Sequence, residues 1–461
     1  MEKILSKLKK VHLIGIGGIG MAGLAYLLKE KGFLVSGSDI RENNIVKQLC
    51  KEGVTISLGH RKENLEGAEI VSYSSAIKKS NPELKEAKRR GLVVLKRAEL
   101  LSLLSQKEKT IAVTGSHGKT TTSSLLSFVL TTLGYSPAVF IGGVSLNYDK
   151  LAWWGKELFV IEADESDASF LYYTPWVSLI TNIDFEHLDY YKSIENLRDH
   201  FLKFASKTTG ITIGCGDDEN TAYVLNRVPS ITYGFSPGNE VRAERMHFDK
   251  EFSCFDLIIA GKRIGRVSIP LLGEHNVLNT LAVLSFFYYL KEDMGRVIPA
   301  LRGFKGTKRR FEKRVVEGVT FIEDYAHHHT EIKAVLKAAQ PLRGKRKIII
   351  FQPHRFSRIK LLYSHFRNCF FSCDYLIITD IYPAGEKKIN GVDGLFLYNE
   401  IKKSFSGRIE YVPKRDLVEV VPPFLREGDL VFFLGAGDIN LVMNEIIRRF
   451  TKIHSKAGSF S

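Results

Sequence analysis

The segment Thr114–Thr122, TGSHGKTTT, has the residue types and spacing that bind the phosphates of a nucleotide. It lies between an apolar run typical of a β-strand and a segment with helical spacing. Gly115 and Gly118 allow successive backbone N–H groups to converge on phosphate oxygens, while Lys119 can neutralise charge and Thr120 can ligate magnesium. The motif lacks the first glycine of the general G-x-x-x-x-G-K-[ST] pattern. We predict a site for ATP or GTP with contacts from Gly115, Ser116, His117, Gly118, Lys119, Thr120 and Thr121.

Acidic residues and a histidine follow the next two apolar runs. EADESD covers residues 162–167 and TNIDFEHLDYY covers residues 181–191. Catalytic loops commonly lie at the carboxyl ends of parallel strands, so these positions favour a functional reading over a solvated acidic surface and a structural histidine. Glu162 and His187 could together hold a second magnesium beside the ion of the phosphate loop.

A second glycine motif lies near the N-terminus. Gly15, Gly17 and Gly20 have the G-x-G-x-x-G spacing, and Asp39 ends the following strand, where it could accept hydrogen bonds from a ribose. NAD, a nucleotide-sugar and a tight turn without a ligand all remain open from this motif alone. Because the phosphate loop at 114–122 already accounts for ATP, a diphosphate-linked sugar would suit the helix terminus at the N-terminal glycine motif.

Two late segments also follow predicted strands: DYAHHHTE at 324–331 and FQPHRFSR at 351–358. Three adjacent histidines suggest zinc, but neighbours in sequence cannot all face one ion on regular structure, and no cysteine lies nearby. Arg355 and Arg358 offer forked donors that suit a carboxylate such as that of an amino acid. A surface ion pair is the alternative for either arginine.

These motifs require a parallel sheet covered by helices, repeated along the chain. Short apolar strands alternate with helical segments, which predicts an α/β fold. A chain of 461 residues exceeds one hydrophobic core, so three domains are expected. We predict domains at 1–104, 105–312 and 313–453, a flexible tail at 454–461, and a β-rich insertion at 240–270.

Composition narrows the class of protein. Hydrophobic residues make up 44% and charged residues 25%, as in ordinary globular proteins. The longest apolar run, Leu281–Leu290, is too short to span a bilayer, and the N-terminus lacks a secretion signal. Five scattered cysteines favour neither disulfides nor zinc. Without a secretion signal or a membrane span, the protein is expected in the cytoplasm, not inserted in a membrane. The net charge of +15 is spread along the whole chain and fits a polyanionic small substrate or a lysine-rich solvated surface as well as nucleic acid, and we predict no nucleic-acid binding.

Ten motifs occur in the order found in one protein family. They are GIGGIGMAGLA, GSHGKTTT, EADESDASF, TNIDFEHLD, GEHNVLN, FKGTKRRFE, DYAHHHTEI, FQPHRFSR, YPAGE and LGAGDI. With these motifs the sequence resembles the Mur ligases of bacterial cell-wall synthesis nearly from end to end. Ten ordered motifs are far more specific than any one of them.

The resemblance implies a Rossmann-like N-terminal domain for a UDP-sugar, a central P-loop mononucleotide-binding ATPase domain, and a Rossmann-like C-terminal domain for an amino acid. It implies ligation of L-alanine to the lactyl carboxylate of UDP-N-acetylmuramate in peptidoglycan synthesis, with ATP and Mg²⁺. ATP would phosphorylate the carboxylate, and the amine would attack the acyl phosphate through a tetrahedral intermediate, releasing ADP and phosphate. A monomer or a homodimer is expected.

The resemblance also implies residue roles. Lys119, His187 and Arg310 would be catalytic, and Thr120, Glu162 and His187 would ligate magnesium. Beyond the phosphate loop, the residues implied for ATP are Asn276, Asn279, Arg310 and Asp324. Those implied for the UDP-sugar are Gly17, Gly18, Asp39, Ser74 and Ser75. Those implied for the amino acid are Tyr325, His327, His354, Arg355 and Arg358.

The sequence departs from the family pattern at three places. Ser116 replaces a threonine, Phe185 and Glu186 replace a proline-aspartate pair, and His329 replaces a proline. The first change is chemically mild, and the other two alter loop stiffness rather than remove a ligand.

Three alternatives remain. A recycling ligase of the same family would attach a whole tripeptide to the same sugar nucleotide. A dehydrogenase would explain the N-terminal glycine motif but not the phosphate loop, and a nucleic-acid-binding ATPase would use the positive charge.

Overall fold

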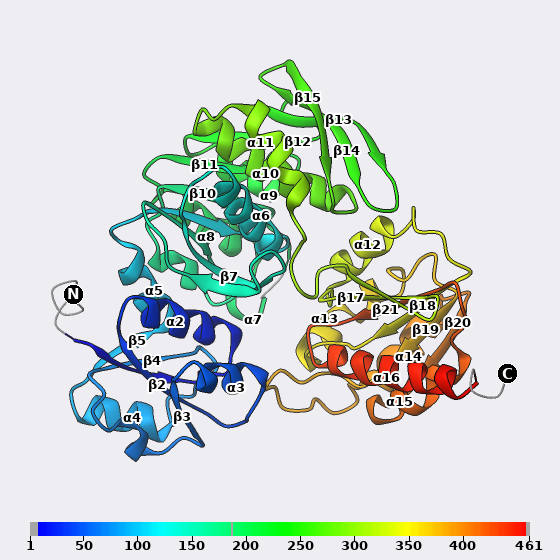
Figure 1. The fold of residues 1–461 in the computed structure, drawn as a ribbon, viewed down its shortest axis with the longest axis horizontal. Coiled ribbons are helices and arrows are strands. Elements are labelled where there is room, and N and C mark those ends of the chain that lie inside the picture. Colours follow the sequence, from blue (N-terminus) through cyan, green and yellow to red (C-terminus); the bar gives the residue numbers. More distant parts are fainter. Residues whose placement is uncertain (1–7, 186–187, 458–461) are drawn as a thin grey trace. The chain divides into compact units, whose positions relative to one another are not determined.

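The computed structural model describes residues 8–185 and 188–457. Within these residues the strands form three sheets, of five, ten and six strands, each covered by helices (Figure 1). The predicted three-domain α/β architecture is therefore confirmed. The predicted boundary at 104/105 lies near the end of α5 at Ser105, and the one at 312/313 lies near the start of β16 at Glu312. Both boundaries stay predictions.

The first sheet is fully parallel and has the order β3-β2-β1-β4-β5. Its strands are β1 (Lys10–Ile14), β2 (Leu34–Asp39), β3 (Thr55–Leu58), β4 (Ile70–Tyr73) and β5 (Val93–Lys96). Its helices are α2 (Ile19–Glu30), α3 (Asn44–Lys51), η1 (Lys62–Leu65), α4 (Pro82–Arg89) and α5 (Arg97–Ser105). The central strand β1 is buried from Val11 onward, as expected for a parallel sheet covered on both faces. This places the carboxyl ends of β1, β2 and β4 along one edge.

The second sheet has the order β15-β14-β13-β12-β11-β10-β6-β9-β7-β8. Its strands are β6 (Lys109–Thr114), β7 (Ala138–Ser145), β8 (Lys150–Trp153), β9 (Leu158–Glu162), β10 (Val177–Ile180), β11 (Ile211–Cys215), β12 (Ser230–Gly234), β13 (Val241–Phe248), β14 (Ser253–Ile259) and β15 (Lys262–Ile269). Its helices are α6 (Lys119–Thr132), η2 (Ser169–Tyr172), α7 (Leu188–Tyr191), α8 (Ile194–Ala205), α9 (Glu219–Leu225), α10 (Glu274–Tyr289), α11 (Met294–Ala300) and η3 (Leu301–Gly303). Strand β6 lies between β10 and β9 and is parallel to both. The predicted β-rich insertion is confirmed as β13 to β15.

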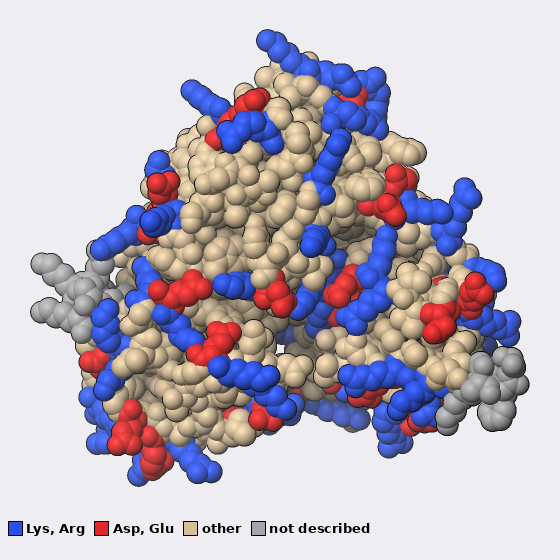
Figure 2. Space-filling model, in the orientation of Figure 1, with Lys and Arg blue, Asp and Glu red and all other residues tan. Residues whose placement is uncertain are grey.

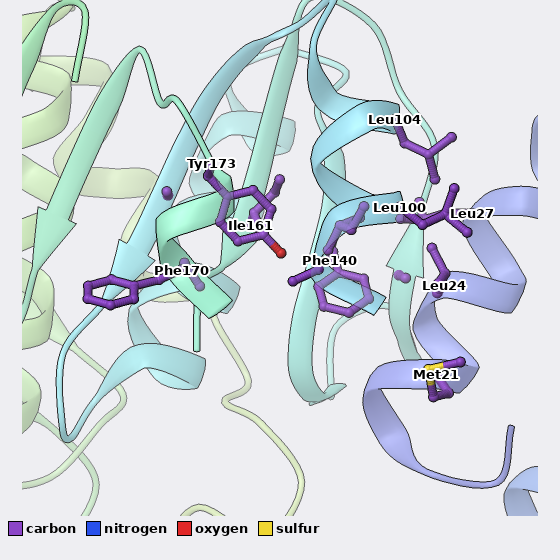
Figure 3. Close-up of a cluster of buried hydrophobic side chains, with 14 of the residues drawn as sticks. Met21, Leu24, Leu27, Leu100, Leu104, Phe140, Ile161, Phe170 and Tyr173 are labelled. Carbon is purple, nitrogen blue, oxygen red and sulfur yellow. The ribbon is translucent and has the colours of Figure 1, made fainter. Parts of the chain in front are cut away.

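One hydrophobic cluster joins the first two sheets (Figure 3). It contains Met21, Leu24 and Leu27 of α2 and Leu100 and Leu104 of α5. On the side of the second sheet it contains Phe140, Ile161, Phe170 and Tyr173. Residues 1–247, 253–270 and 276–307 accordingly form one compact unit, here called the first unit. The first and second sheets therefore belong to the same compact unit.

The third sheet has the order β16-β17-β21-β18-β19-β20. Its strands are β16 (Glu312–Val316), β17 (Val319–Asp324), β18 (Arg346–Phe351), β19 (Tyr375–Ile378), β20 (Arg408–Tyr411) and β21 (Asp429–Leu434). Its helices are α12 (His329–Ala338), α13 (Phe356–Phe366), α14 (Gly394–Lys402), η4 (Lys414–Asp416), α15 (Leu417–Val420), η5 (Pro422–Phe424) and α16 (Ile439–Ala457). Only the edge strand β16 runs antiparallel to its neighbour, and separate apolar clusters cover the two faces. This sheet belongs to the second unit (248–252, 271–275 and 308–461).

Helix α16 continues to Ala457, four residues into the segment predicted as a flexible tail. The His454 ring lies 4.2 Å from that of the buried Phe450, and its Nδ1 lies 3.1 Å from Phe450 O, contacts that join the predicted tail to the preceding turn of the helix. In the part of the chain that the structure describes, no helix is both long and apolar enough to cross a membrane. All five cysteines are free. Lys and Arg are dispersed among Asp and Glu on the face shown in Figure 2.

Candidate active site

The phosphate loop connects β6 to α6, and the backbone conformation at both of its glycines favours glycine over other residues. Gly115 and Gly118 have φ angles of 127° and 85°, a region that favours glycine. A Cβ at Gly115 would overlap Thr181 Oγ1, and a Cβ at Gly118 would overlap Asn279 Oδ1. The loop therefore ends on a bare helix N-terminus, which is suited to binding phosphate.

The segment after β10 holds this loop in place. Ser116 N donates to Asn182 O at 3.0 Å, and His117 N donates to Asn182 Oδ1 at 3.0 Å. Thr181 Oγ1 donates to His117 O at 2.6 Å, and His117 Nε2 lies 3.0 Å from Asp184 Oδ2. The two motifs therefore lie side by side, as their positions after adjacent strands require. His187 lies outside the described residues, and its role stays a prediction.

Lys119 is bound to an acidic residue that sequence analysis did not single out. Its Nζ lies 2.9 Å from Glu165 Oε1 and 2.8 Å from Oε2, and it donates to Gly115 O at 2.5 Å. Glu165 is only 1% exposed. Burial lowers the pKa of Lys119, but the charges of Glu165 and Asp164 outweigh it, so the pKa lies above its usual value. Lys119 is therefore positively charged at neutral pH.

Thr120 and Glu162 present hard oxygen donors next to Lys119. Thr120 Oγ1 donates to Glu162 Oε1 at 3.0 Å, and Gly142 N donates to Glu162 Oε2 at 2.7 Å. A hydroxyl and a carboxylate are oxygen ligands of the kind that Mg²⁺ prefers. The two residues therefore fit a magnesium site beside the phosphate loop.

Two asparagines of α10 contact the first turn of α6. Asn279 Nδ2 donates to Asn276 Oδ1 at 3.1 Å, and Thr122 Oγ1 donates to Asn279 Oδ1 at 3.2 Å. Both asparagines are buried. Their predicted contact with ATP stays a prediction, while their contact with the first turn of α6 is a feature that sequence analysis did not anticipate.

The N-terminal glycine turn follows β1. Gly15 N donates to Ser38 O at 2.8 Å, and Gly17 N donates to Asp39 Oδ2 at 2.9 Å. Helix α2 begins at this turn with Gly18 as its N-cap, without a side-chain cap and without an acidic residue in its first turn. Ser74 N donates to Ile14 O, so the loop after β4 adjoins the turn. The structure thus gathers the residues predicted for the sugar nucleotide at one edge of the sheet: Gly17, Gly18, Asp39, Ser74 and the exposed Ser75.

In the second unit, Asp324 ends β17 and is 5% exposed. Its carboxylate accepts N–H groups of Phe311 at 2.8 Å and Ala326 at 2.7 Å. Burial raises its pKa to about 6, although the nearby Arg310 opposes the shift. The Arg310 guanidinium lies 5.1 Å from the ring centre of Tyr325, and its Nη1 lies 3.9 Å from Glu331 Oε1. Arg310 and Asp324 are therefore neighbours.

Residues after β17 and β18 form a second group. The His327 ring lies 5.5 Å from the Tyr325 ring and 5.1 Å from the His354 ring. Arg358 Nη1 lies 3.0 Å from His354 Nδ1, which must accept because a guanidinium only donates. Burial, helped by Arg358, lowers the pKa of His354 to about 3, and burial places that of His327 well below its usual value. The group therefore combines neutral imidazoles with a fixed positive charge.

Arg355 and Tyr382 complete this group. Arg355 has a φ of 68°, and its backbone N donates to Tyr382 O at 2.9 Å. The Tyr382 ring stacks on His354 with an interplanar angle of 8°. Tyr382 was missed by sequence analysis, although it belongs to the quoted motif YPAGE.

The three adjacent histidines contact different neighbours. His328 and His329 have ring centres 4.1 Å apart, and His329 also lies 4.8 Å from His365, while His327 faces Tyr325. His329 is the first residue of α12, a helix position that also suits proline. The departure from the family pattern at His329 is therefore compatible with the helix start.

Models of the Mur ligase family match the chain in three consecutive parts. The catalytic domain model of the family matches residues 10–109 and the middle domain model matches residues 113–286. The glutamate ligase domain model matches residues 309–437.

Individual proteins match over almost the whole chain. A UDP-N-acetylmuramate–L-alanine ligase of Solidesulfovibrio magneticus is 42% identical over 442 residues, which are 94% of this chain and 96% of that protein. The crystal structure of the UDP-N-acetylmuramate–alanine ligase of Thermotoga maritima has a TM-score of 0.84 at 29% identity and covers 97% of this chain and 99% of its own. A murein peptide ligase of Psychrobacter arcticus has a TM-score of 0.69 at 22% identity, covering 96% and 99%, and shares the fold.

Proposed function

The chain belongs to the Mur ligase family, and from this membership we propose that it joins L-alanine to UDP-N-acetylmuramate at the expense of ATP, in peptidoglycan synthesis. The observation that carries the proposal is the 42% identity to a UDP-N-acetylmuramate–L-alanine ligase across 94% of the chain. The reaction places the protein in the cytoplasm, where ATP is available.

The proposed reaction has two steps. The lactyl carboxylate attacks the γ-phosphorus of ATP, which releases ADP and forms an acyl phosphate. The amine of L-alanine then attacks the acyl carbon, and the tetrahedral intermediate expels phosphate while the nitrogen loses a proton. The first step is needed because a carboxylate oxygen is a poor leaving group until it carries a phosphoryl group.

The phosphate loop binds ATP in this proposal. Backbone N–H groups at the start of α6 cradle the phosphates, and Lys119 exchanges its contact with Glu165 for the β- and γ-phosphates. Charge stabilisation of the transferring phosphoryl group is the main catalytic task in such reactions. Lys119 suits it because its raised pKa keeps the amine charged.

Thr120 and Glu162 would hold magnesium, and His187 is proposed to serve a second magnesium. Bound there, the ion would neutralise charge on the ATP phosphates. The proposal assigns ATP contacts also to Asn276, Asn279, Arg310 and Asp324.

The amino acid is assigned to the group formed by Tyr325, His327, His354, Arg355 and Arg358. The guanidinium of Arg358 is held by His354 and can bind the carboxylate of L-alanine through two parallel hydrogen bonds. Because the two imidazoles are neutral, they do not repel the incoming amino group. The sugar nucleotide is assigned to Gly17, Gly18, Asp39, Ser74 and Ser75.

The decisive experiment mixes the protein with ATP, Mg²⁺, UDP-N-acetylmuramate and one acceptor at a time: L-alanine, glycine, L-serine or the tripeptide. Product masses and ADP release are measured. We expect the largest kcat/KM with L-alanine and a product heavier than the sugar nucleotide by one alanine residue. A preference for the tripeptide would assign the chain to the recycling reaction instead, and ADP release that needs DNA or RNA rather than the sugar would overturn the ligase assignment.

A further inference from the structure

Arg97, the first residue of α5, lies between the glycine turn of the first sheet and an acidic loop of the second. Its Nη2 is 3.7 Å from Asp164 Oδ2. A Cβ at Gly20 would overlap its Nη1, so the guanidinium packs directly on the second residue of α2. The side chain is 22% exposed, and its guanidinium carbon lies 5.9 Å from the ring centre of Phe140.

The acidic loop carries two consecutive carboxylates that face different partners. Asp164 faces Arg97, and Glu165 faces Lys119 of the phosphate loop. The two residues therefore connect the surroundings of Gly20 with the phosphate loop through two ion pairs on adjacent residues, Arg97 with Asp164 and Glu165 with Lys119.

Several hydrogen bonds make this loop stiff. Asp164 Oδ1 accepts from Ser166 N at 3.0 Å, and Asp164 O accepts from Ser169 Oγ at 3.1 Å. Glu165 O accepts from Ala168 N at 3.0 Å and from the hydroxyl of Tyr191. A displacement of Asp164 is therefore passed to Glu165 rather than absorbed between them.

An anion bound at the glycine turn would change the charge balance around Arg97. A cation next to a helix N-terminus is unfavourable, and the first turn of α2 holds no acidic residue to offset it. Asp164 supplies the offsetting negative charge, because its carboxylate lies 3.7 Å from the Arg97 guanidinium. A diphosphate at the turn would compete with Asp164 for the same guanidinium.

We propose that Arg97 is a positioning residue that couples the sugar-nucleotide site to the ATP site through Asp164 and Glu165. When the diphosphate of the sugar nucleotide occupies the glycine turn, Arg97 turns toward it and its hold on Asp164 weakens. The stiff acidic loop then moves as one piece, and Glu165 releases Lys119 to the phosphates of ATP. The inference rests on the proposed function, because that function places the sugar nucleotide at this turn.

The coupling is measured by calorimetric titration with a non-hydrolysable ATP analogue and Mg²⁺, without and with saturating UDP-N-acetylmuramate. For the wild-type protein we expect the sugar nucleotide to tighten analogue binding about 5-fold or more, within the usual range for coupled sites. In Arg97→Met and Asp164→Asn this ratio should fall to about 1, and the double variant should show no further loss. Arg97→Lys should retain part of it.

A purely structural role for Arg97 predicts a different result. It would lower the Tm and weaken both affinities, yet leave the ratio between them unchanged. The matched control is Arg89→Met, which removes an arginine of the same domain that is 73% exposed and pairs with Glu86. If Arg97→Met does not fold, Asp164→Asn decides the matter, because it leaves the packing of Arg97 on Gly20 in place.

The outcomes separate this inference from the proposed function. A wild-type protein that fails to bind UDP-N-acetylmuramate contradicts the proposed function. A wild-type protein that binds both ligands with a ratio of 1, or an Arg97→Met variant that keeps the wild-type ratio, overturns the coupling alone.

Discussion

Replacement of Lys119 by alanine should reduce both stability and ligation, and a second substitution should separate the two effects. Lys119 is 16% exposed and its partner Glu165 only 1%. Removal of one member of such a buried ion pair costs about 3–5 kcal/mol. Because Lys119 is not fully buried, we take the lower end of this range and expect a loss of about 3 kcal/mol. For a domain of 150–250 residues this corresponds to a fall in Tm of roughly 6–12 °C.

The double variant Lys119→Ala with Glu165→Gln removes the buried charge together with the amine. Its Tm should recover most of the loss, because a neutral amide replaces the carboxylate. Ligation should not recover, because the contact with the ATP phosphates is still missing. We expect kcat to be lower by about 10²–10³ in both variants.

Thermal unfolding and ADP release with UDP-N-acetylmuramate and L-alanine measure the two effects separately. Lys156→Ala, which removes an exposed lysine of the same domain, is the control and should leave both values unchanged. Near wild-type ADP release by a folded Lys119→Ala protein would refute the assignment of the phosphate loop. A double variant no more stable than the single one would refute the role given to Glu165.

Three further predictions follow from the same geometry. Gly118→Ala should weaken binding of the ATP analogue at least about 10-fold, because a positive φ costs ~1–2 kcal/mol and its Cβ would overlap Asn279. Asp324 has a pKa of about 6 when folded, above its ordinary 3.8, so its stabilising contribution is present at low pH and is lost as pH rises through 6. In the wild-type protein this group should lower the free energy of unfolding by roughly 3 kcal/mol between pH 4 and 7. Asp324→Asn should abolish that fall, which would be measured as a flatter dependence of Tm on pH. Arg358→Met should raise KM for L-alanine about 10-fold or more with little change in KM for ATP, because the donor held by His354 is lost.

Each of these variants has a matched control in the chain. Gly134 also has a positive φ but nothing within 4 Å of its Cβ position, so Gly134→Ala should strain the backbone without affecting nucleotide binding. Glu317→Gln and Arg343→Met remove exposed charges from the third domain. Equal effects in variant and control would contradict the corresponding reasoning, as would a rise in KM for ATP alone in Arg358→Met.

Much of the site could be predicted because its chemistry is local in sequence. The phosphate loop needs two glycines with positive φ and a lysine at fixed separations, and these needs are visible in Gly115, Gly118 and Lys119. The strands that position it are continuous apolar runs, as buried parallel strands must be. Strand β3 was not predicted, since Thr55–Leu58 is only partly buried and has no such run.

The partners of these residues could not be predicted in the same way. The motif EADESD offers four carboxylates within six residues, and the backbone path after β9 decides that Glu162 faces Thr120 while Glu165 faces Lys119. Tyr382 joins His354 across two parallel strands, a contact with no local sequence signal. The family resemblance suggested which residues of each domain bind a substrate, but it did not show which neighbours their side chains contact.

The sequence by itself determined which chemical groups this protein carries and the order in which strands present them, because loop conformation and strand burial depend on neighbouring residues. Tertiary structure alone decided which charges meet. Arg97 reaches both Gly20 and Asp164 because the apolar cluster of α2, α5 and β7 packs the first sheet against the second. Such a contact depends on the packing of segments far apart in the chain, and no pattern of neighbouring residues encodes it.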